Sequence, residues 1–351
     1  MSKIIPGESG SFSSFLSDGC KLCQQGAKMV LFVTGICPKD CFYCPVSNER
    51  RTDSTYANER KVISDQDLLE EARQMDALGT GITGGEPLLK IERVIYYLKL
   101  LKKEFGPRHH IHLYTSMAPD RETLKELSQA GLDEIRFHPP VELWDRMDNT
   151  SYADSINFAK ELGMEAGIEI PSIEGADKMA LFAESNGCFL NLNEMEFSDT
   201  NTDAMKAKGY TLRDDVSNAV IGSEEYAAEI AQNCEMIHFC SSSYKDAVQL
   251  RNRLIRIAEN TARPFDEISE DGTIIYGHIE CATSDEIEIV NNELLQMEVA
   301  PDMMGSTADG IDIAWWILED LAETIRTQMR KMYILERYPF KDGLIVEKIP
   351  L

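Results

Sequence analysis

The feature that most restricts the fold is a repeated alternation of short apolar or β-branched runs with helical stretches between Val30 and Ser198. Strand-sized runs that alternate with helices are typical of βα units, in which the strands pair in parallel and helices cover the sheet. Six such units can be counted, so the pattern predicts an α/β fold. The six predicted strands lie at residues 30–36, 80–84, 110–116, 133–138, 164–170 and 188–197.

The helix between the first two strands illustrates the pattern. Its apolar residues Leu68, Ala72 and Met75 recur every three or four positions, which places them on one face of a helix. Ser64 can cap the start of this helix, and we expect Gly79 to end it.

The alternation fades beyond Thr200, which predicts a change of architecture. Asp271 and Gly272 stand between two extended runs, and this dipeptide favours a hairpin turn. We therefore expect an N-terminal extension at 1–29, a core at 30–205 and a smaller α+β region at 206–351. In the last region we predict helices at 223–232, 244–260 and 311–329, and extended runs at 332–338 and 343–349.

Composition restricts the partners and the compartment. The 351 residues contain 35 Lys and Arg against 60 Asp and Glu, a net charge of −25, which disfavours nucleic acid as a partner. No apolar run approaches the roughly 18 residues of a membrane helix, and the first residues lack a signal peptide's apolar stretch. We expect a cytoplasmic protein whose nine cysteines serve metal binding or catalysis rather than disulfides.

Three cysteines follow the first predicted strand at the spacing C-x3-C-x2-C: Cys37, Cys41 and Cys44. Three thiolates on a short loop suit an iron-sulfur cluster. A four-iron cluster needs four ligands, so this loop leaves one iron free for a small molecule. Two alternatives remain: an electron-transfer cluster completed by a distant cysteine, and a structural zinc site.

The second predicted strand ends in Thr83-Gly84-Gly85-Glu86-Pro87, and Gly84 stands 40 residues after Cys44 (84 − 44). Paired glycines at a strand end allow a close approach of the backbone to a ligand. With the cysteine spacing and the aromatic Tyr43 before the third cysteine, this segment resembles the radical S-adenosylmethionine (radical SAM) enzymes, in particular members similar to the pyruvate formate-lyase activating enzyme.

This resemblance implies a partial (β/α)6 barrel related to the TIM barrel, with the smaller α+β domain added. It also implies that the three cysteines hold a [4Fe-4S] cluster and that S-adenosylmethionine binds its free iron. Gly84, Gly85, Glu86 and Pro87 then lie along the methionine part, and the backbone near Tyr43 lies close to the adenine. Reductive cleavage yields a 5′-deoxyadenosyl radical that takes a hydrogen atom from the substrate. A low-potential donor such as ferredoxin or flavodoxin supplies the electron.

Further candidates for the cofactor site lie at the carboxyl ends of the other predicted strands, because all βα loops of a parallel barrel emerge on that rim. They are Ser116, His138 and Glu169, together with Glu194 or Glu196. Each also has a structural interpretation: Ser116 caps a turn, His138 is a buried histidine with satisfied hydrogen bonds, and the last two glutamates are solvated.

A second metal site is predicted from Cys20 and Cys23, because a C-x2-C pair supplies two thiolates from one turn. We expect Cys240 and Cys281 to complete it, with His238 as the alternative to Cys281. The group bound is then zinc or an auxiliary iron-sulfur cluster. The competing interpretation is that these cysteines are buried residues or free thiols.

The target of the chemistry is not encoded in these motifs. The resemblance covers enzymes that form glycyl radicals on partner proteins, modify peptides or rearrange metabolites. The densest basic stretch, Lys245 with Arg251, Arg253 and Arg256, is predicted to be a charged helix face rather than a nucleic-acid site. A metal-binding or electron-transfer protein without S-adenosylmethionine cleavage is the alternative function.

Overall fold

The computed structural model describes residues 3–214, 216–326, 330–340 and 343–351. The chain forms two compact units: Met1–Arg73 with Ala77–Leu250, and Gln74–Asp76 with Arg251–Leu351. Among the described residues no helix is long and apolar enough to cross a membrane.

The first unit is built on one curved sheet of the order β1-β2-β11-β10-β9-β8-β7-β6-β3-β4-β5. Its seven central strands pair in parallel, so the α/β fold is confirmed. All six predicted strands are present, and β11 adds a seventh that the sequence pattern did not predict. The parallel strands are β3 (Lys28–Phe32), β6 (Gly79–Thr83), β7 (His110–Thr115), β8 (Glu134–Phe137), β9 (Glu165–Pro171), β10 (Phe189–Asn193) and β11 (Ile237–Cys240).

Short antiparallel strands flank both edges of this parallel sheet. At one edge β2 pairs with β11 and β1, and at the other β4 pairs with β3 and β5. This unit extends past residue 205, where we expected the core to end, because β11 belongs to its sheet. The flanking strands are β1 (Ile5–Pro6), β2 (Phe12–Ser13), β4 (Tyr56–Ala57) and β5 (Arg60–Lys61).

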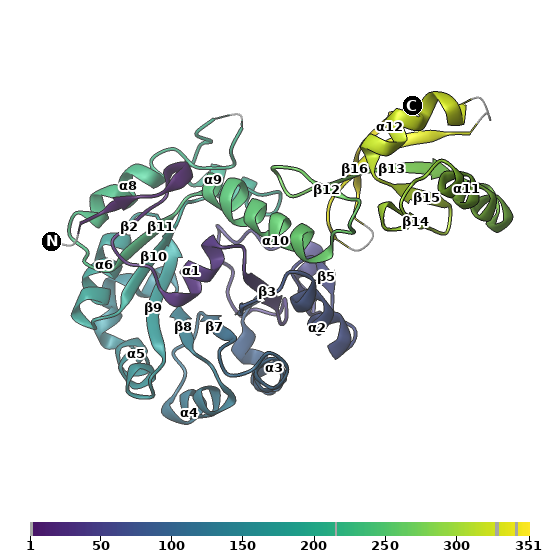
Figure 1. Cartoon of the computed structure of the whole chain (residues 1–351). Helices are drawn as coiled ribbons and strands as arrows, with labels where there is room; N and C mark the ends of the chain where they lie inside the picture. The colour runs from purple at the N-terminus through teal and green to yellow at the C-terminus, as the bar shows by residue number, and fades with distance from the viewer. Residues whose placement is uncertain (1–2, 215, 327–329, 341–342) are drawn as a thin grey trace. The chain divides into compact units, whose positions relative to one another are not determined.

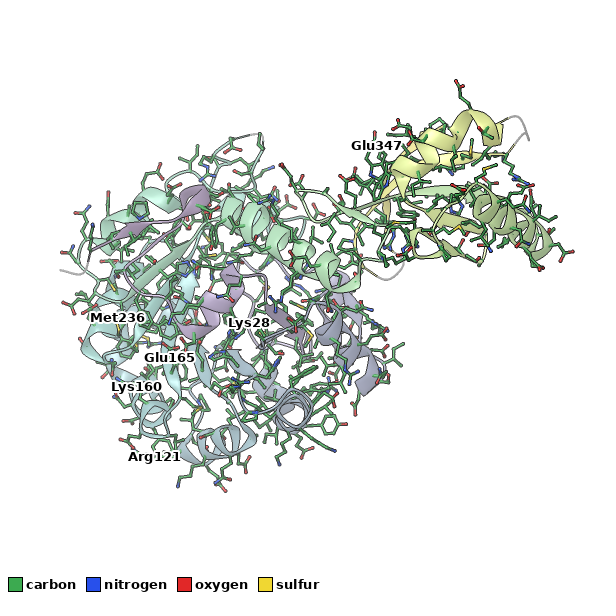
Figure 2. All side chains as sticks on the ribbon, viewed as in Figure 1. Lys28, Arg121, Lys160, Glu165, Met236 and Glu347 are labelled. Carbon is green, nitrogen blue, oxygen red and sulfur yellow. The ribbon has the colours of Figure 1, made fainter. Side chains whose placement is uncertain are left out.

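Amphipathic helices cover the outer face of the sheet (Figure 1). Helix α3 buries Val94, Leu98 and Leu101 on one face and ends at Gly106, whose φ is 85°. Charged residues of these helices, such as Arg121, face outward (Figure 2). The helices are α2 (Asp65–Gln74), α3 (Ile91–Phe105), α4 (Arg121–Ala130), α5 (Tyr152–Glu161), α6 (Ala176–Ser185), α7 (Thr202–Ala207) and α8 (Ser223–Ala231).

The expected end of the first helix is wrong. Helix α2 ends at Gln74, and Gly79 is the first residue of β6. The chain has already left the helix at Asp76, which adopts a φ of 44°. Gly79 is required for a different reason: a Cβ there would lie 2.5 Å from the carbonyl oxygen of His110 on the neighbouring strand.

A short helix, α1 (Asp18–Gln24), lies on the inner side of the sheet (Figure 1). Ser17 caps it, and the backbone NH of Gly19 donates to the Glu134 carboxylate over 2.9 Å. A Cβ on Gly19 would lie 2.6 Å from Nδ1 of His112, so only glycine lets the helix approach β7 and β8 this closely. The inside of the barrel is therefore filled by α1 and by polar side chains.

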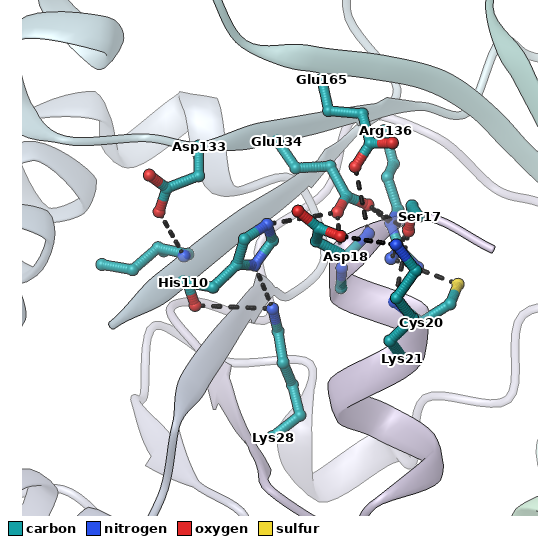
Figure 3. A network of polar contacts seen from close by, with 12 residues as sticks. Ser17, Asp18, Cys20, Lys21, Lys28, His110, Asp133, Glu134, Arg136 and Glu165 are labelled. Carbon is teal, nitrogen blue, oxygen red and sulfur yellow. Dashed lines mark hydrogen bonds and ion pairs between the residues drawn. The ribbon is translucent and has the colours of Figure 1, made fainter. Parts of the chain in front are cut away.

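Arg136 is the centre of this buried network (Figure 3). Its guanidinium donates to Glu134 over 2.5 Å and to Glu169 over 2.7 Å, so one positive charge stabilises two buried carboxylates. His110 and His112 lie beside Glu134, and one possible metal-ligand atom from each of the three residues lies within 4.8 Å of the others. Among the described residues this is the one group of His, Cys, Asp or Glu side chains placed closely enough to hold a metal ion.

This histidine and glutamate group is better explained as part of the network than as a metal site. The Lys28 ammonium lies 2.6 Å from Nδ1 of His110, and the Arg136 guanidinium contacts the Glu134 carboxylate. Two cations next to the group oppose the binding of a third.

The second unit contains an antiparallel sheet of the order β14-β15-β13-β16-β17, with β12 paired to β13. Its core includes Ile279, Val290, Leu294, Ile311 and Leu318. The strands are β12 (Glu267–Ile268), β13 (Ile274–Glu280), β14 (Met304–Ser306), β15 (Gly310–Ile313), β16 (Met332–Arg337) and β17 (Ile345–Pro350). The helices are α10 (Arg251–Thr261), α11 (Ser284–Gln296) and α12 (Trp315–Arg326).

The hairpin predicted at Asp271 and Gly272 is confirmed, since β12 and β13 pair antiparallel around Gly272, whose φ is 82°. The extended runs at 332–338 and 343–349 correspond to β16 and β17. The helix predicted at 223–232 is α8, and the one at 244–260 is formed by a π-helical turn at Lys245–Leu250 followed by α10.

The helix predicted at 311–329 is wrong at its start. Residues up to Ile313 form β15, because they pair with β13, and α12 begins at Trp315. Its predicted end, 327–329, lies outside the described residues.

Candidate active site

The cysteine loop begins directly after β3, at the carboxyl edge of the parallel sheet. Cys37 is exposed, Cys41 and Cys44 are half-buried, and all three thiols are free of disulfides. The backbone NH of Cys44 donates to the carbonyl of Cys41 over 3.0 Å, which tightens the turn between them. Partial burial raises the pKa of the Cys37 and Cys41 thiols.

The glycines at the end of β6 pack against the start of this loop. The NH of Gly85 donates to Thr34 over 2.7 Å, and the NH of Glu86 donates to Ile36 over 2.8 Å. A Cβ on Gly84 would lie 2.5 Å from the Thr34 carbonyl oxygen, and one on Gly85 2.5 Å from that of Ile36. The two glycines therefore let the backbones of the two motifs touch.

Glu86 is fully buried at the carboxyl end of β6, and its carboxylate is held by four donors. The backbone NH of Leu88 donates over 3.0 Å, the Thr115 hydroxyl over 2.8 Å, and the Ser116 NH and hydroxyl over 2.7 Å and 2.6 Å. Ser116, a predicted cofactor contact, thus orients Glu86. Pro87 begins the short helix Pro87–Lys90 that follows.

Tyr43 and His138 meet on the same rim. The Tyr43 hydroxyl lies 2.9 Å from Nε2 of His138, whose Nδ1 lies 2.7 Å from the carbonyl oxygen of Glu169. Because that carbonyl can only accept, Nδ1 carries the proton and Nε2 accepts from Tyr43. Burial lowers the pKa of His138, which keeps the ring neutral, and raises the pKa of Tyr43.

The Glu169 side chain belongs to the interior of the barrel. Its carboxylate accepts from Arg136 over 2.7 Å and from Asn191 and Asn193 over 3.0 Å each. The charge of Arg136 and these hydrogen bonds lower its pKa against the effect of burial.

The two glutamates after β10 are ion-paired, and the interpretation as a solvated side chain is wrong for Glu194, which is buried, whereas Glu196 is half-buried. Glu194 is buried and accepts from Arg213 over 2.6 Å and from the NH of Ser242 over 2.7 Å. Glu196 pairs with Lys245. Tertiary contacts made by segments 213 and 242–245 create these pairs, which no local pattern signals.

Sequence reasoning missed Asn201, which is 2% exposed. Its side-chain NH2 donates to the Tyr43 carbonyl over 3.1 Å and to the Glu196 carbonyl over 3.0 Å, and its Oδ1 accepts from the Ser198 NH over 2.7 Å. It thereby ties the segment after β10 to the cysteine loop. No spacing or periodicity marks this residue in the sequence.

The cysteines of the expected second site are distributed over both units. Cys20 and Cys23 lie in α1, and Cys240 lies in β11; burial raises the pKa of Cys23 to about 11 and that of Cys240 to about 12. Nε2 of His238, on the same strand as Cys240, has no hydrogen-bond partner among the described residues. Cys281 is instead buried in the apolar core of the second unit.

A free three-cysteine loop after the first parallel strand, in contact with the glycine-rich end of the second, defines the radical SAM class of barrel enzyme. Comparison with known proteins agrees. Residues 31–165 match the model of the radical SAM superfamily, and residues 272–351 match a domain of unknown function, DUF8061.

The most informative relative is a protein of Methanocaldococcus jannaschii with the provisional name of a glycyl-radical enzyme activating enzyme. It is 39% identical over 352 residues, which cover 96% of this chain and 93% of the relative. The chain therefore belongs to the radical SAM superfamily.

Two further matches span less than two thirds of the proteins concerned. Biotin synthase of Pseudomonas putida is 34% identical over 119 residues, 31% of each chain. The crystal structure of methylornithine synthase aligns with a TM-score of 0.41 and 14% identity over 60% of this chain and 63% of that one.

Membership implies a [4Fe-4S] cluster and S-adenosylmethionine as cofactors. The residues present fit this pair. Three soft thiol donors stand free on one loop, and a backbone of glycines and the buried Glu86 carboxylate lie beside them.

Proposed function

We propose that this radical SAM enzyme is an activating enzyme that forms a glycyl radical on a partner protein. The observation that carries the proposal is the relative of that name, which matches over nearly the full length of both chains, including the region after the barrel. When bound, the cluster and S-adenosylmethionine supply a 5′-deoxyadenosyl radical, which takes a hydrogen atom from the substrate.

In this proposal each motif of the rim has one task. Cys37, Cys41 and Cys44 are the ligands of the cluster. Gly84, Gly85, Glu86 and Pro87 lie along the methionine part of S-adenosylmethionine, where backbone carbonyls at the strand end can accept from its ammonium group.

The residues around these motifs hold them in place. Ser116 orients Glu86 through two hydrogen bonds. His138 holds the ring of Tyr43, whose backbone lies near the adenine in this proposal. Glu169 contributes its backbone carbonyl to His138 and its carboxylate to the buried network.

We further propose a cytoplasmic enzyme that takes its electron from a ferredoxin or flavodoxin. A second metal site, for zinc or an iron-sulfur cluster, remains part of the proposal. Its candidate ligands are Cys20, Cys23, Cys240 and His238, which all belong to the first unit, whereas Cys281 belongs to the second. Nε2 of His238 is buried and has no hydrogen-bond partner among the described residues. No three ligand atoms of this set lie within 4.8 Å of one another, so metal binding requires these side chains to move together.

The cofactor assignment is tested by anaerobic reconstitution of the wild type and of a variant with Cys37, Cys41 and Cys44 changed to Ala. We expect about four irons on the loop cluster and 5′-deoxyadenosine after reduction in the wild type only. Wild-type enzyme that holds iron without forming 5′-deoxyadenosine contradicts the enzyme assignment. Complete loss of metal in the variant contradicts the second site.

The partner assignment is tested by electron paramagnetic resonance. Reconstituted enzyme, reductant and S-adenosylmethionine are mixed with each candidate glycyl-radical protein from the same organism. We expect a carbon-centred radical on one such protein, and its loss when the acceptor glycine is changed to Ala. Formation of 5′-deoxyadenosine that depends on a small metabolite, with no protein radical, contradicts this assignment.

A further inference from the structure

A hollow of about 380 Å³ opens on the first unit, in the segment that follows β10. None of the tasks described above uses it, and its volume is near the lower end of the range for ligand sites. Its lining consists of Phe197, Lys206, Gly209, Tyr210, Thr211 and Leu212.

The hollow is formed by a loop that folds back on the chain after β10. The NH of Phe197 donates to Asn218 over 2.8 Å, and Leu212 forms an antiparallel bridge with Val220. Phe197 is 7% exposed, whereas Leu212 is 47% exposed. A buried aromatic ring thus lies beside an exposed aliphatic side chain that is available for a partner.

The hollow adjoins the cysteine loop. The ring of Tyr210, which lines it, stacks on Phe42 with 5.8 Å between ring centroids. Phe42 lies between Cys41 and Cys44, and Asn201 donates to the carbonyl of the next residue, Tyr43. A molecule seated in the hollow therefore contacts the same segment that holds the cysteine loop.

The chemistry of the lining selects an apolar group with a negative charge beside it. Phe197, Tyr210 and Leu212 supply the apolar surface. Lys206 is exposed at the edge, Lys208 lies over the ring of Phe42, and neither pairs with a carboxylate in the part of the chain that the structure describes.

We propose that this hollow seats an apolar side chain of the protein substrate, flanked by an acidic residue that meets Lys206 and Lys208. The inference rests on the proposed function, because a protein substrate is what supplies such a segment. It assigns the hollow as a docking subsite beside the cysteine loop, so that substrate docking and the geometry of the loop are linked through Tyr210 and Asn201.

The first test measures the partner concentration needed for half-maximal glycyl-radical formation with full-length, reconstituted enzyme. We expect Leu212→Glu to raise this concentration at least tenfold, in keeping with the loss of one buried aliphatic contact, and Leu212→Met to leave it within twofold. The control is Leu181→Glu, on the outer helix α6, where the residue is 64% exposed.

An unchanged half-maximal concentration in Leu212→Glu overturns the proposal, as does an equal effect of Leu181→Glu. A third outcome also overturns it: Leu212→Glu changes the self-association of the enzyme on dilution but leaves the half-maximal partner concentration unchanged. That outcome assigns the hollow to a second copy of the chain.

The second test needs no partner protein, so that it distinguishes failure of the docking proposal from failure of the proposed function. The probes are two fluorescein-labelled peptides with Glu-Leu-Glu or Lys-Leu-Lys in a Gly-Ser background. We expect the wild type to bind the acidic peptide at least fivefold more tightly by fluorescence anisotropy, and Lys206→Glu to lose that preference. Lys206 is exposed, so this variant leaves the fold intact. Equal binding of both peptides by the wild type overturns the proposal.

Discussion

The contact between the two motifs predicts the effect of one added methyl group, Gly85→Ala. The new Cβ would lie 2.5 Å from the carbonyl oxygen of Ile36 and 2.8 Å from that of Gly35. Ordinary contacts begin at 3.4 Å, so the backbone just before Cys37 must move by 0.9 Å (3.4 − 2.5). Both atoms belong to the backbone, so no side chain can rotate to relieve the overlap.

Overpacking of this kind costs about 1–3 kcal/mol. For a unit of about 250 residues, 2 kcal/mol lowers the melting temperature by about 4–8 °C. The displacement also moves the first cysteine relative to the other two. We therefore expect Gly85→Ala to hold less than half of the wild-type iron on the cysteine loop.

The assay combines thermal unfolding of the metal-free protein with iron counting after anaerobic reconstitution. The control is Gly305→Ala in β14, where the new Cβ meets its nearest neighbour, the Phe265 ring, at an ordinary 3.5 Å. A Gly85→Ala protein with wild-type melting temperature and wild-type iron content would refute the reasoning, because it would show that the two backbones are not in contact.

Three further predictions concern the buried polar groups. Arg136→Met leaves the two carboxylates that Arg136 bridges without their charge partner, so we expect the free energy of unfolding in urea to fall by about 3–5 kcal/mol. The control Arg121→Met removes a surface pair and should lower it by less than about 1 kcal/mol. Burial lowers the pKa of His109 to about 4, from 6.5 when unfolded, so the folded state loses stability as the pH falls from about 6.5 to 4. His109→Gln should show a smaller loss between pH 7 and 5; an equal loss would contradict this assignment. Asn201→Ala removes the donor to the Tyr43 carbonyl, so we expect faster loss of iron to a chelator; Asn201→Asp, which keeps the acceptor oxygen but not the donor, should behave like Ala.

Local patterns in the sequence were sufficient for the βα core and for the two motifs of the site. Apolar periodicity is a property of neighbouring residues, so it predicted the six strands. The order of the parallel strands then placed the cysteine loop and Gly84 on one rim. The hairpin at Asp271 and Gly272 was readable for the same reason, because turn geometry depends on the residues in the turn.

Predictions failed where a residue's role depends on distant partners. Gly79 begins a strand because it pairs with Lys28 of β3 and His110 of β7, and residues up to Ile313 form a strand because β13 pairs with them. Cys281 is a thiol like Cys20, but it is packed in the apolar core of the other unit. The local sequence contains none of these partners, so it could not predict the three roles.

The sequence by itself determined the class of chemistry, because three thiolates at this spacing and a glycine-rich strand end 40 residues later are local features. The tertiary structure decided which side chains hold those motifs. Glu86 is oriented by residues of β7 and its following loop, Tyr43 by His138 just after β8, and the cysteine loop by Asn201 after β10. Hydrogen bonds between residues so far apart in the chain depend on how the strands are ordered in the sheet, which no short window of sequence contains.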